Sequence, residues 1–248
     1  MTLNNDNTST EQYEIAREVL AALDGHRQIA PLSEGNPAFD LASAYRVAAA
    51  VRRLREDRGE RVVGRKIGFT NYRVWAEYGV TAPIWGYVYD TTLHRLADLD
   101  APFSLSALAE PRIEPEIAFK LARAPEPEMD ERALLDCIEW VAHGFEILQS
   151  HYPGWRFTAA DTVAAFGLHG ALLLGPPKPI TPANAGGWQA ALAAFDISLL
   201  RDGVVADKGR ATNVLGGGPL TALRHRARPR RLSVDGGQRS LSLGLCKG

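Results

Sequence analysis

The stretch PRIEPEIAFK, residues 111–120, alternates apolar and polar residues and predicts a β-strand. On such a strand Glu114 and Glu116 share one face and lie about 6.6 Å apart along the strand. Two carboxylates at this distance repel each other unless a cation lies between them, and Mg²⁺ and Mn²⁺ prefer oxygen ligands. The same face could instead be the solvated face of an edge strand, which Pro115 permits. The stretch therefore predicts a metal site or an exposed acidic edge.

A third carboxylate, Glu146, lies within the mostly apolar stretch 140–148, which is also expected to be a strand. Burying a lone ionised carboxylate is costly unless the group is paired with a cation or bound to one. We therefore expect Glu146 to be protonated, salt-bridged or bound to a metal. The alternative is a glutamate at the end of its strand that points to solvent.

Two basic residues are candidates for binding an anionic substrate. Lys66 lies in the expected strand 61–70, between Gly64 and Gly68 on its own face, and glycine inside a strand often marks the close approach of a ligand. Arg156 lies near a turn and could bind a carboxylate through two hydrogen bonds. The alternatives are a surface lysine on a glycine-rich edge strand and an ordinary surface salt bridge.

The six histidines do not show the close spacing of a metal site. His143 and His169 lie in apolar contexts and are predicted to be hydrogen-bonded core residues. The sequence also contains no G-x-S-x-G nucleophile elbow, no Walker loop and no dinucleotide-binding fingerprint.

The hydrophobic pattern predicts an α+β fold, with an N-terminal helical segment, residues 1–60, before a β-rich body, residues 61–223. Amphipathic helices are expected at 10–23 and 40–58, with a loop at 31–37 between them. A short helix is expected at 130–137. Further strands are expected at 113–120, 140–148, 170–174 and 194–206, the last with a hairpin turn at 201–203.

The last 25 residues, 224–248, form an atypical tail with seven basic residues and one acidic residue, whereas the whole chain has a net charge of −1. The arginine-rich start of the tail shows no apolar face. We interpret the tail as the product of a reading-frame change or as a natural truncated variant. It is expected to be poorly ordered and to lower stability or activity.

The overall composition is that of a globular protein, with 46% hydrophobic and 23% charged residues among 248. The chain has no basic excess of the kind that nucleic-acid-binding proteins show, and no apolar stretch long enough for a membrane span. Two cysteines cannot form a disulfide framework, and the N-terminus does not resemble a secretory signal. These observations predict a cytoplasmic protein without nucleic-acid or membrane partners.

Several segments, taken together and in this order, resemble the 2-keto-4-pentenoate hydratase / 4-oxalocrotonate decarboxylase family, within the wider fumarylacetoacetate hydrolase fold. The resemblance extends from about residue 12 to 223. The segments are GRKIGFTN (64–71), YGVTAPIWG (78–86), PRIEPEIAF (111–119), HGFEIL (143–148), ADTVA (160–164) and NVLGGGPLTAL (213–223).

This resemblance implies a mixed, mostly β roll with helices at its side, and a site with assigned roles. Lys66 matches a lysine that faces the substrate, and Asp161 lies in a segment that lines the same site, so both are candidate catalytic residues. Arg156 stands where many hydratases have a lysine and is a candidate for substrate binding. Three carboxylates match the ligands of Mg²⁺ or Mn²⁺: Glu114, Glu116 and Glu146.

The activity that the resemblance implies is hydration of 2-hydroxypenta-2,4-dienoate (2-keto-4-pentenoate) to 4-hydroxy-2-oxopentanoate, in the catabolism of aromatic ring-cleavage products. The alternatives are decarboxylation of 4-oxalocrotonate, acylpyruvate-type hydrolysis, or a catalytically impaired subunit. The implied partners are a small 2-oxo or 2-hydroxydienoate acid and further copies of the chain, with a homologous hydratase or decarboxylase as another candidate. Departures from the family pattern at 80–86 and 164–169 leave the far end of the substrate open.

Overall fold

The computed structural model describes residues 9–227 and 241–245. Eight strands form one mixed sheet in the order β2-β1-β10-β4-β5-β6-β3, with β7 paired to β5. These strands are β1 (Val62–Gly68), β2 (Ile84–Tyr89), β3 (Leu93–Arg95), β4 (Arg112–Leu121), β5 (Ile138–Leu148), β6 (His169–Leu174), β7 (Lys178–Pro179) and β10 (Leu241–Leu245). Two further strands, β8 (Asp196–Arg201) and β9 (Val204–Arg210), form a separate hairpin.

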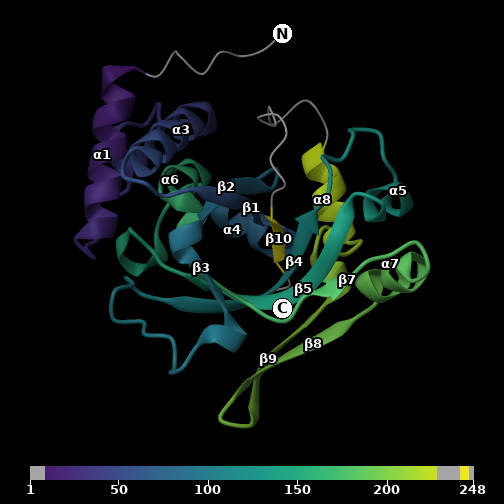
Figure 1. The fold of residues 1–248 in the computed structure, drawn as a ribbon. Coiled ribbons are helices and arrows are strands. Elements are labelled where there is room, and N and C mark those ends of the chain that lie inside the picture. The colour runs from purple at the N-terminus through teal and green to yellow at the C-terminus, as the bar shows by residue number, and fades with distance from the viewer. Residues whose placement is uncertain (1–8, 228–240, 246–248) are drawn as a thin grey trace.

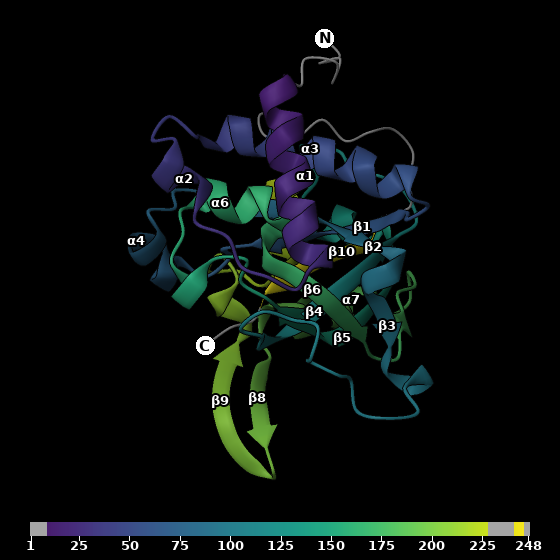
Figure 2. The ribbon, with the colours of Figure 1, turned by 90° about the vertical axis from the view of Figure 1, so that its left-hand side faces the viewer.

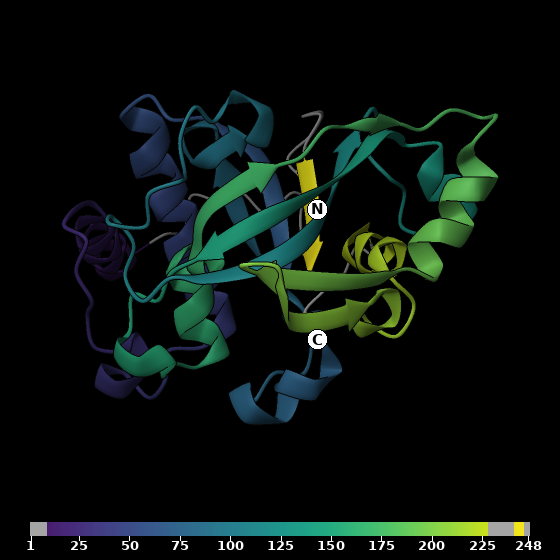
Figure 3. The same ribbon diagram turned by 90° about the horizontal axis from the view of Figure 1, so that it is seen from below.

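Helices lie on two sides of the sheet (Figure 1). Seen from below, the long strands curve across the molecule between the purple and blue N-terminal helices and the green α7 (Figure 3). The helices are α1 (Thr10–Asp24), α2 (Leu32–Gly35), α3 (Leu41–Asp57), α4 (Trp75–Tyr78), α5 (Glu131–Leu135), α6 (Ala159–Ala164), α7 (Ala185–Ala193) and α8 (Pro219–Ala227). None of these helices is long and apolar enough to cross a membrane.

The two predicted N-terminal helices are confirmed as α1 and α3. Each begins at a residue whose side chain accepts a hydrogen bond from the first turn: Ser9 caps α1, and Asp40 caps α3. Their apolar faces pack on α6 in one core. The loop expected at 31–37 instead contains the one-turn helix α2.

The predicted central strands are confirmed as β1, β4, β5 and β6, and the short helix as α5. The hairpin is confirmed as β8–β9, which projects from the body (Figure 2). Its turn residues Asp202 and Gly203 have φ of 53° and 79°, the left-handed pair that a tight hairpin with right-handed strand twist requires. These elements confirm the predicted α+β class.

The expectation that the C-terminal tail is poorly ordered is wrong for residues 224–227 and 241–245, whereas its origin and its effect on stability or activity stay predictions. Helix α8 continues beyond residue 223 to Ala227, and β10 pairs parallel with β1 and antiparallel with β4. The alternating sequence LSLGL, residues 241–245, is a strand pattern that the neighbouring arginines obscured. Residues 228–240 and 246–248 lie outside the described part of the chain. The division into segments at residues 60 and 223 stays a prediction.

His151 is a buried histidine whose ring nitrogens both lack a hydrogen-bond partner among the described residues. Burial lowers the pKa of its imidazole from 6.5 to about 4. The folded protein therefore holds the ring neutral at a pH where the unfolded chain protonates it. Above pH 6.5 the ring is neutral in both states and does not lower the free energy of unfolding. As the pH falls from 6.5 toward 4, protonation of the unfolded chain lowers that free energy by about 3 kcal/mol.

Replacing His151 by leucine should remove this pH dependence. We expect the free energy of unfolding of the unaltered protein to fall by about 3 kcal/mol more than that of His151→Leu between pH 7 and pH 4. Urea unfolding at both pH values measures the difference. The control is His143→Leu, because His143 is exposed. This exposure also shows that the prediction of a core position for His143 is wrong. Equal pH dependence of His151→Leu and the unaltered protein would contradict the prediction.

Candidate active site

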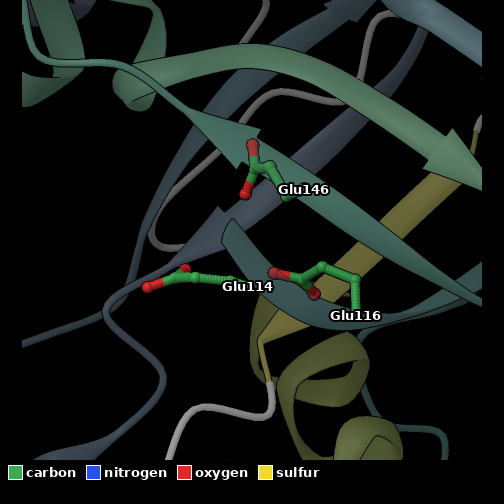
Figure 4. Close-up of side chains that lie close together, drawn as sticks. All are labelled: Glu114, Glu116 and Glu146. Carbon is green, nitrogen blue, oxygen red and sulfur yellow. The ribbon is translucent and has the colours of Figure 1, made fainter. Parts of the chain in front are cut away.

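Three buried glutamates converge on two adjacent strands of the sheet. In the antiparallel pair β4–β5, Glu114 lies directly opposite Glu146, and Glu116 follows two residues later on the same face of β4. The exposed fractions of Glu114, Glu116 and Glu146 are 5%, 1% and 0%. One carboxylate oxygen from each lies within 4.8 Å of the other two. Figure 4 shows the three side chains close together on the two strands. Because all three carboxylates are buried, the alternative interpretation of an exposed acidic edge strand is excluded.

Glu116 is electrostatically the least compensated of the three. Burial raises the pKa of its carboxyl well above the ordinary value, and the negative charges of Glu146 and Glu114 raise it further. Its Oε2 atom is buried and has no hydrogen-bond partner among the described residues. A buried oxygen without a partner, beside two other carboxylates, fits the oxygen-rich coordination of a divalent cation.

Glu146 has two direct partners that compensate its burial. Its Oε2 lies 2.7 Å from Nζ of Lys66, and its Oε1 lies 2.7 Å from Nδ1 of His169. Burial alone would raise the pKa of this carboxyl, but Lys66 and His169 together hold it below the ordinary value. Glu146 is therefore an ionised carboxylate, and the alternative of a solvent-facing strand end is wrong.

His169 acts on the site through Glu146. Burial lowers the pKa of its imidazole even though Glu146 favours the charged form, so the ring is neutral near pH 7. Nδ1 must then carry the proton that it donates to the carboxylate, while Nε2 lies 2.9 Å from Oγ1 of Thr92. The prediction of a hydrogen-bonded core histidine is confirmed. Its partner could not be predicted, because the sequence does not show that β6 pairs with β5.

An open cleft with about 680 Å³ of empty space lies against these groups. Lys66 and Glu114 line it, and aromatic rings form much of its wall. Tyr78 stacks on Phe157 with ring centroids 5.3 Å apart. Lys66 lies on the wall of the cleft, and its contact with a ligand stays a prediction. The sequence pattern does not indicate its direct ion pair with Glu146.

Asp161 does not line this cleft, and its predicted catalytic role is not supported. The side chain is fully buried and accepts four hydrogen bonds, two from Ser33 and two from Thr158. It closes a capping box at the start of α6 and ties that helix to α2. The next residue, Thr162, lines the cleft instead, because successive helical residues point about 100° apart. We therefore assign Asp161 a structural role.

Arg156 is exposed and is also absent from the cleft lining, so its predicted substrate contact is not supported either. Arg112 is the arginine that lines the cleft. Its guanidinium carbon lies 3.9 Å from the centre of the Trp155 ring. The alternation of β4 could have revealed it, since Arg112 precedes Glu114 and Glu116 on the same face at the same two-residue spacing.

Curated relatives of this chain carry hydratase and decarboxylase names. The chain is 34% identical over 198 residues to 2-hydroxyhexa-2,4-dienoate hydratase of Comamonas testosteroni, covering 79% of this chain and 72% of the relative. It is 31% identical over 217 residues to 2-keto-4-pentenoate hydratase of Paraburkholderia xenovorans, covering 87% and 77%. It is 31% identical over 200 residues to 4-oxalocrotonate decarboxylase of Pseudomonas sp. CF600, covering 80% and 69%. No protein-family model matches the chain.

A solved structure has the same fold. The 4-oxalocrotonate decarboxylase of Pseudomonas putida G7, complexed with magnesium and adipate, superposes with a TM-score of 0.80 at 21% identity, over 100% of this chain and 91% of that one. At this identity the likeness shows the fold, which confirms the predicted roll. The sequence matches to the curated relatives show the family as well as the fold. The chain belongs to the family of 2-keto-4-pentenoate hydratases and 4-oxalocrotonate decarboxylases.

Proposed function

We propose that this protein is a metal-dependent hydratase that converts 2-hydroxypenta-2,4-dienoate to 4-hydroxy-2-oxopentanoate. The observation that carries the proposal is the cluster of Glu114, Glu116 and Glu146, three buried carboxylates beside a cleft that Lys66 also lines. The hydratase names of several relatives supply the reaction type. The proposed biological role is in the breakdown of aromatic ring-cleavage products.

The three glutamates would hold the divalent cation, for which we propose Mg²⁺ or Mn²⁺. When bound, such a cation supplies Lewis-acid stabilisation of negative charge on a substrate oxygen. Lys66 balances the charge of Glu146 and lies on the wall of the cleft, where its ammonium group would face an anionic substrate. The rings of Phe69, Tyr78 and Phe157 limit the access of water to the apolar part of the substrate.

Replacing Lys66 by methionine should abolish turnover and also destabilise the protein. The substitution leaves the ionised Glu146 buried without its lysine, which typically costs about 3–5 kcal/mol. The double variant Lys66→Met/Glu146→Gln removes both charges and should recover much of that stability without recovering activity. Melting temperature and steady-state turnover separate the two effects. Normal turnover in Lys66→Met would show that Lys66 has a purely structural role.

The test of the reaction type is product mass. Purified protein, loaded with Mg²⁺ or Mn²⁺, is incubated with 2-hydroxypenta-2,4-dienoate and, separately, with 4-oxalocrotonate. A gain of one water on the first substrate supports the hydratase. Loss of CO₂ from the second supports the alternative, decarboxylation, which the relatives named 4-oxalocrotonate decarboxylase also suggest. No product from either substrate, with metal bound, would point to the catalytically impaired subunit.

We also propose that the protein acts in the cytoplasm as a homo-oligomer. The proposed substrate is a small catabolic acid, and the family resemblance implies further copies of the chain as partners. Light scattering of the purified chain tests the assembly, and a mass equal to one chain would exclude it. Mixing with a homologous hydratase or decarboxylase tests whether a mixed complex forms.

A further inference from the structure

Thr92 is a half-buried residue outside the cleft lining, and its hydroxyl group contacts the imidazole of His169. It ends the short 3₁₀ turn Asp90–Thr92, and β3 begins at the next residue. Strand β3 pairs parallel with β6, with Leu93 opposite Leu172, and His169 is the first residue of β6. The pairing of these two strands therefore brings a hydroxyl group from the β2–β3 connection to the start of β6.

The donor in each contact of this chain of three side chains follows from counting hydrogen bonds. A carboxylate oxygen of Glu146 lies 2.7 Å from Nδ1 of His169 and can only accept, so Nδ1 donates. A neutral imidazole has one ring proton, so Nε2 is left with a lone pair. Oγ1 of Thr92 lies 2.9 Å from Nε2 and is the one partner of that nitrogen among the described residues. The Thr92 hydroxyl consequently donates to His169, and His169 donates to Glu146.

The backbone of Tyr89 orients the Thr92 hydroxyl. The Tyr89 N–H donates to Oγ1 at 3.3 Å and so occupies the acceptor side of the hydroxyl. The carbonyl oxygen of Tyr89 lies 3.1 Å from Oγ1 and competes for the same proton. The contact with Nε2 of His169 is shorter, and a buried ring nitrogen left without a donor is costly. Donation to His169 is therefore favoured over donation to the carbonyl.

The contacts of Glu146 with two neighbours fix the orientation of its carboxylate. Lys66 holds Oε2 and His169 holds Oε1, each at 2.7 Å. A carboxylate has about four lone-pair positions, so about two remain for a cation. Hydrogen bonds that orient a metal-binding side chain from outside the ligand set matter for binding, and their loss typically lowers metal affinity about 10- to 100-fold. The direction of the His169 N–H is therefore part of how Glu146 is presented to a metal.

We infer that Thr92 is a positioning residue of the metal site, because its hydroxyl holds the imidazole of His169 in the orientation that directs Nδ1–H at Glu146. The inference rests on the proposed function, since it assumes that Glu114, Glu116 and Glu146 bind the divalent cation. Thr92 does not line the cleft, and its hydrogen bonds go to His169 and to backbone groups. It acts on the cluster through His169.

The Mn²⁺ affinity of an isosteric variant tests this inference. Thr92→Val replaces the hydroxyl by a methyl group of similar size, and we expect titration calorimetry to show at least about 10-fold weaker Mn²⁺ binding. Thr92→Ser keeps a hydroxyl group and should bind Mn²⁺ within about twofold of the unaltered protein. Thr92→Ala removes the hydroxyl with less bulk and should resemble Thr92→Val, which keeps the test valid if valine disturbs the packing.

Thr91→Val is the matched control, because Thr91 precedes Thr92 in the same turn and its hydroxyl donates to Glu60 at 2.6 Å. It should lower the melting temperature without lowering Mn²⁺ affinity, which separates the loss of a structural hydrogen bond from the loss of positioning. Nitrogen NMR of metal-free protein labelled in histidine adds a readout that needs no metal. The ring signals of His169 should show the proton on Nδ1 in the unaltered protein and in Thr92→Ser, and should change in Thr92→Val.

Unchanged Mn²⁺ affinity in Thr92→Val and Thr92→Ala, with Mn²⁺ bound by the unaltered protein, would overturn the inference and leave the proposed function intact. Equal losses of affinity in Thr91→Val and Thr92→Val would overturn it as well, because the turn as a whole would then be responsible. A ring proton on Nε2 of His169 in the unaltered protein would contradict the assigned donors. Absence of Mn²⁺ binding and of turnover in the unaltered protein would overturn the proposed function, and the inference with it.

Discussion

Glu116→Gln should remove metal binding and turnover together. The substitution keeps the shape of the side chain but replaces an anionic oxygen donor by a neutral amide. Divalent cations such as Mg²⁺ and Mn²⁺ depend on carboxylate oxygens, and the cluster has three of them within 4.8 Å of one another. We expect Mn²⁺ affinity to fall by at least about 100-fold, since a lost charge-assisted contact typically costs about 3 kcal/mol.

Whether Glu116→Gln raises or lowers the free energy of unfolding is a sharper test of this metal site than the loss of affinity. In metal-free protein, burial raises the pKa of the Glu116 carboxyl, and the like charges of Glu146 and Glu114 raise it further. A neutral amide at this position should therefore raise the free energy of unfolding without metal, while removing the stabilisation that Mn²⁺ gives to the unaltered protein. Thermal unfolding with and without Mn²⁺ measures both effects.

Glu139→Gln is the matched control, because Glu139 lies on β5, the strand of Glu146, but is exposed. It should leave Mn²⁺ affinity, turnover and melting temperature unchanged. Normal turnover of Glu116→Gln after chelator treatment and without added metal would falsify the metal hypothesis. Unchanged Mn²⁺ affinity in that variant would instead place the ion elsewhere.

The metal-site candidates could be predicted from sequence because the pattern that reveals them is local. Glu114 and Glu116 share a face by strand alternation alone, and Glu146 stands out as an acid in an apolar strand. The Lys66–Glu146 pair could not be predicted in the same way. In sheet order β1 and β5 are three strand spacings apart, about 14 Å in a flat sheet, yet the charged atoms are 2.7 Å apart. The curvature of the sheet, visible in Figure 1, makes this contact possible.

Two candidate residues lie outside the cleft lining for a different reason. Asp161 is a candidate because its segment resembles one that lines the site, and Arg156 because it stands where many hydratases have a lysine. Neither residue is part of the cleft lining. On helix α6 a shift of one residue exchanges Asp161, which caps the helix, for Thr162, which lines the cleft. Such a shift depends on where the helix begins, and this is the least predictable feature of a short helix.

The basic composition of the tail obscures the strand pattern at residues 241–245. Strand β10 lies between β1, which carries Lys66, and β4, which carries Glu114 and Glu116. It is paired on both sides, so it is an internal strand of the sheet. A five-residue segment near the end of the sequence therefore determines the distance between the strand of the lysine and the strand of two glutamates.

Leu243→Pro should consequently disrupt both the sheet and the site. Residue 243 lies opposite Lys66 on β1 and opposite Ala118 on β4. Proline has no backbone N–H, and it is found at sheet edges rather than in internal strands. Each backbone group left buried without a partner costs about 1–3 kcal/mol, against a net stability of about 5–15 kcal/mol. We expect a large fall in the urea midpoint and loss of the tight Mn²⁺ site.

Val204→Pro is the control that separates this effect from proline substitution in general. Val204 begins β9 in the projecting hairpin, outside the eight-stranded sheet, and is 71% exposed. That variant should keep its Mn²⁺ affinity and lose little stability, because its strand pairs with β8 alone. If Leu243→Pro instead matched the unaltered protein in urea midpoint and Mn²⁺ affinity, β10 would not be the strand that joins β1 to β4. The lysine and the two glutamates would then be held at their distance by the remaining strands and the helices around them.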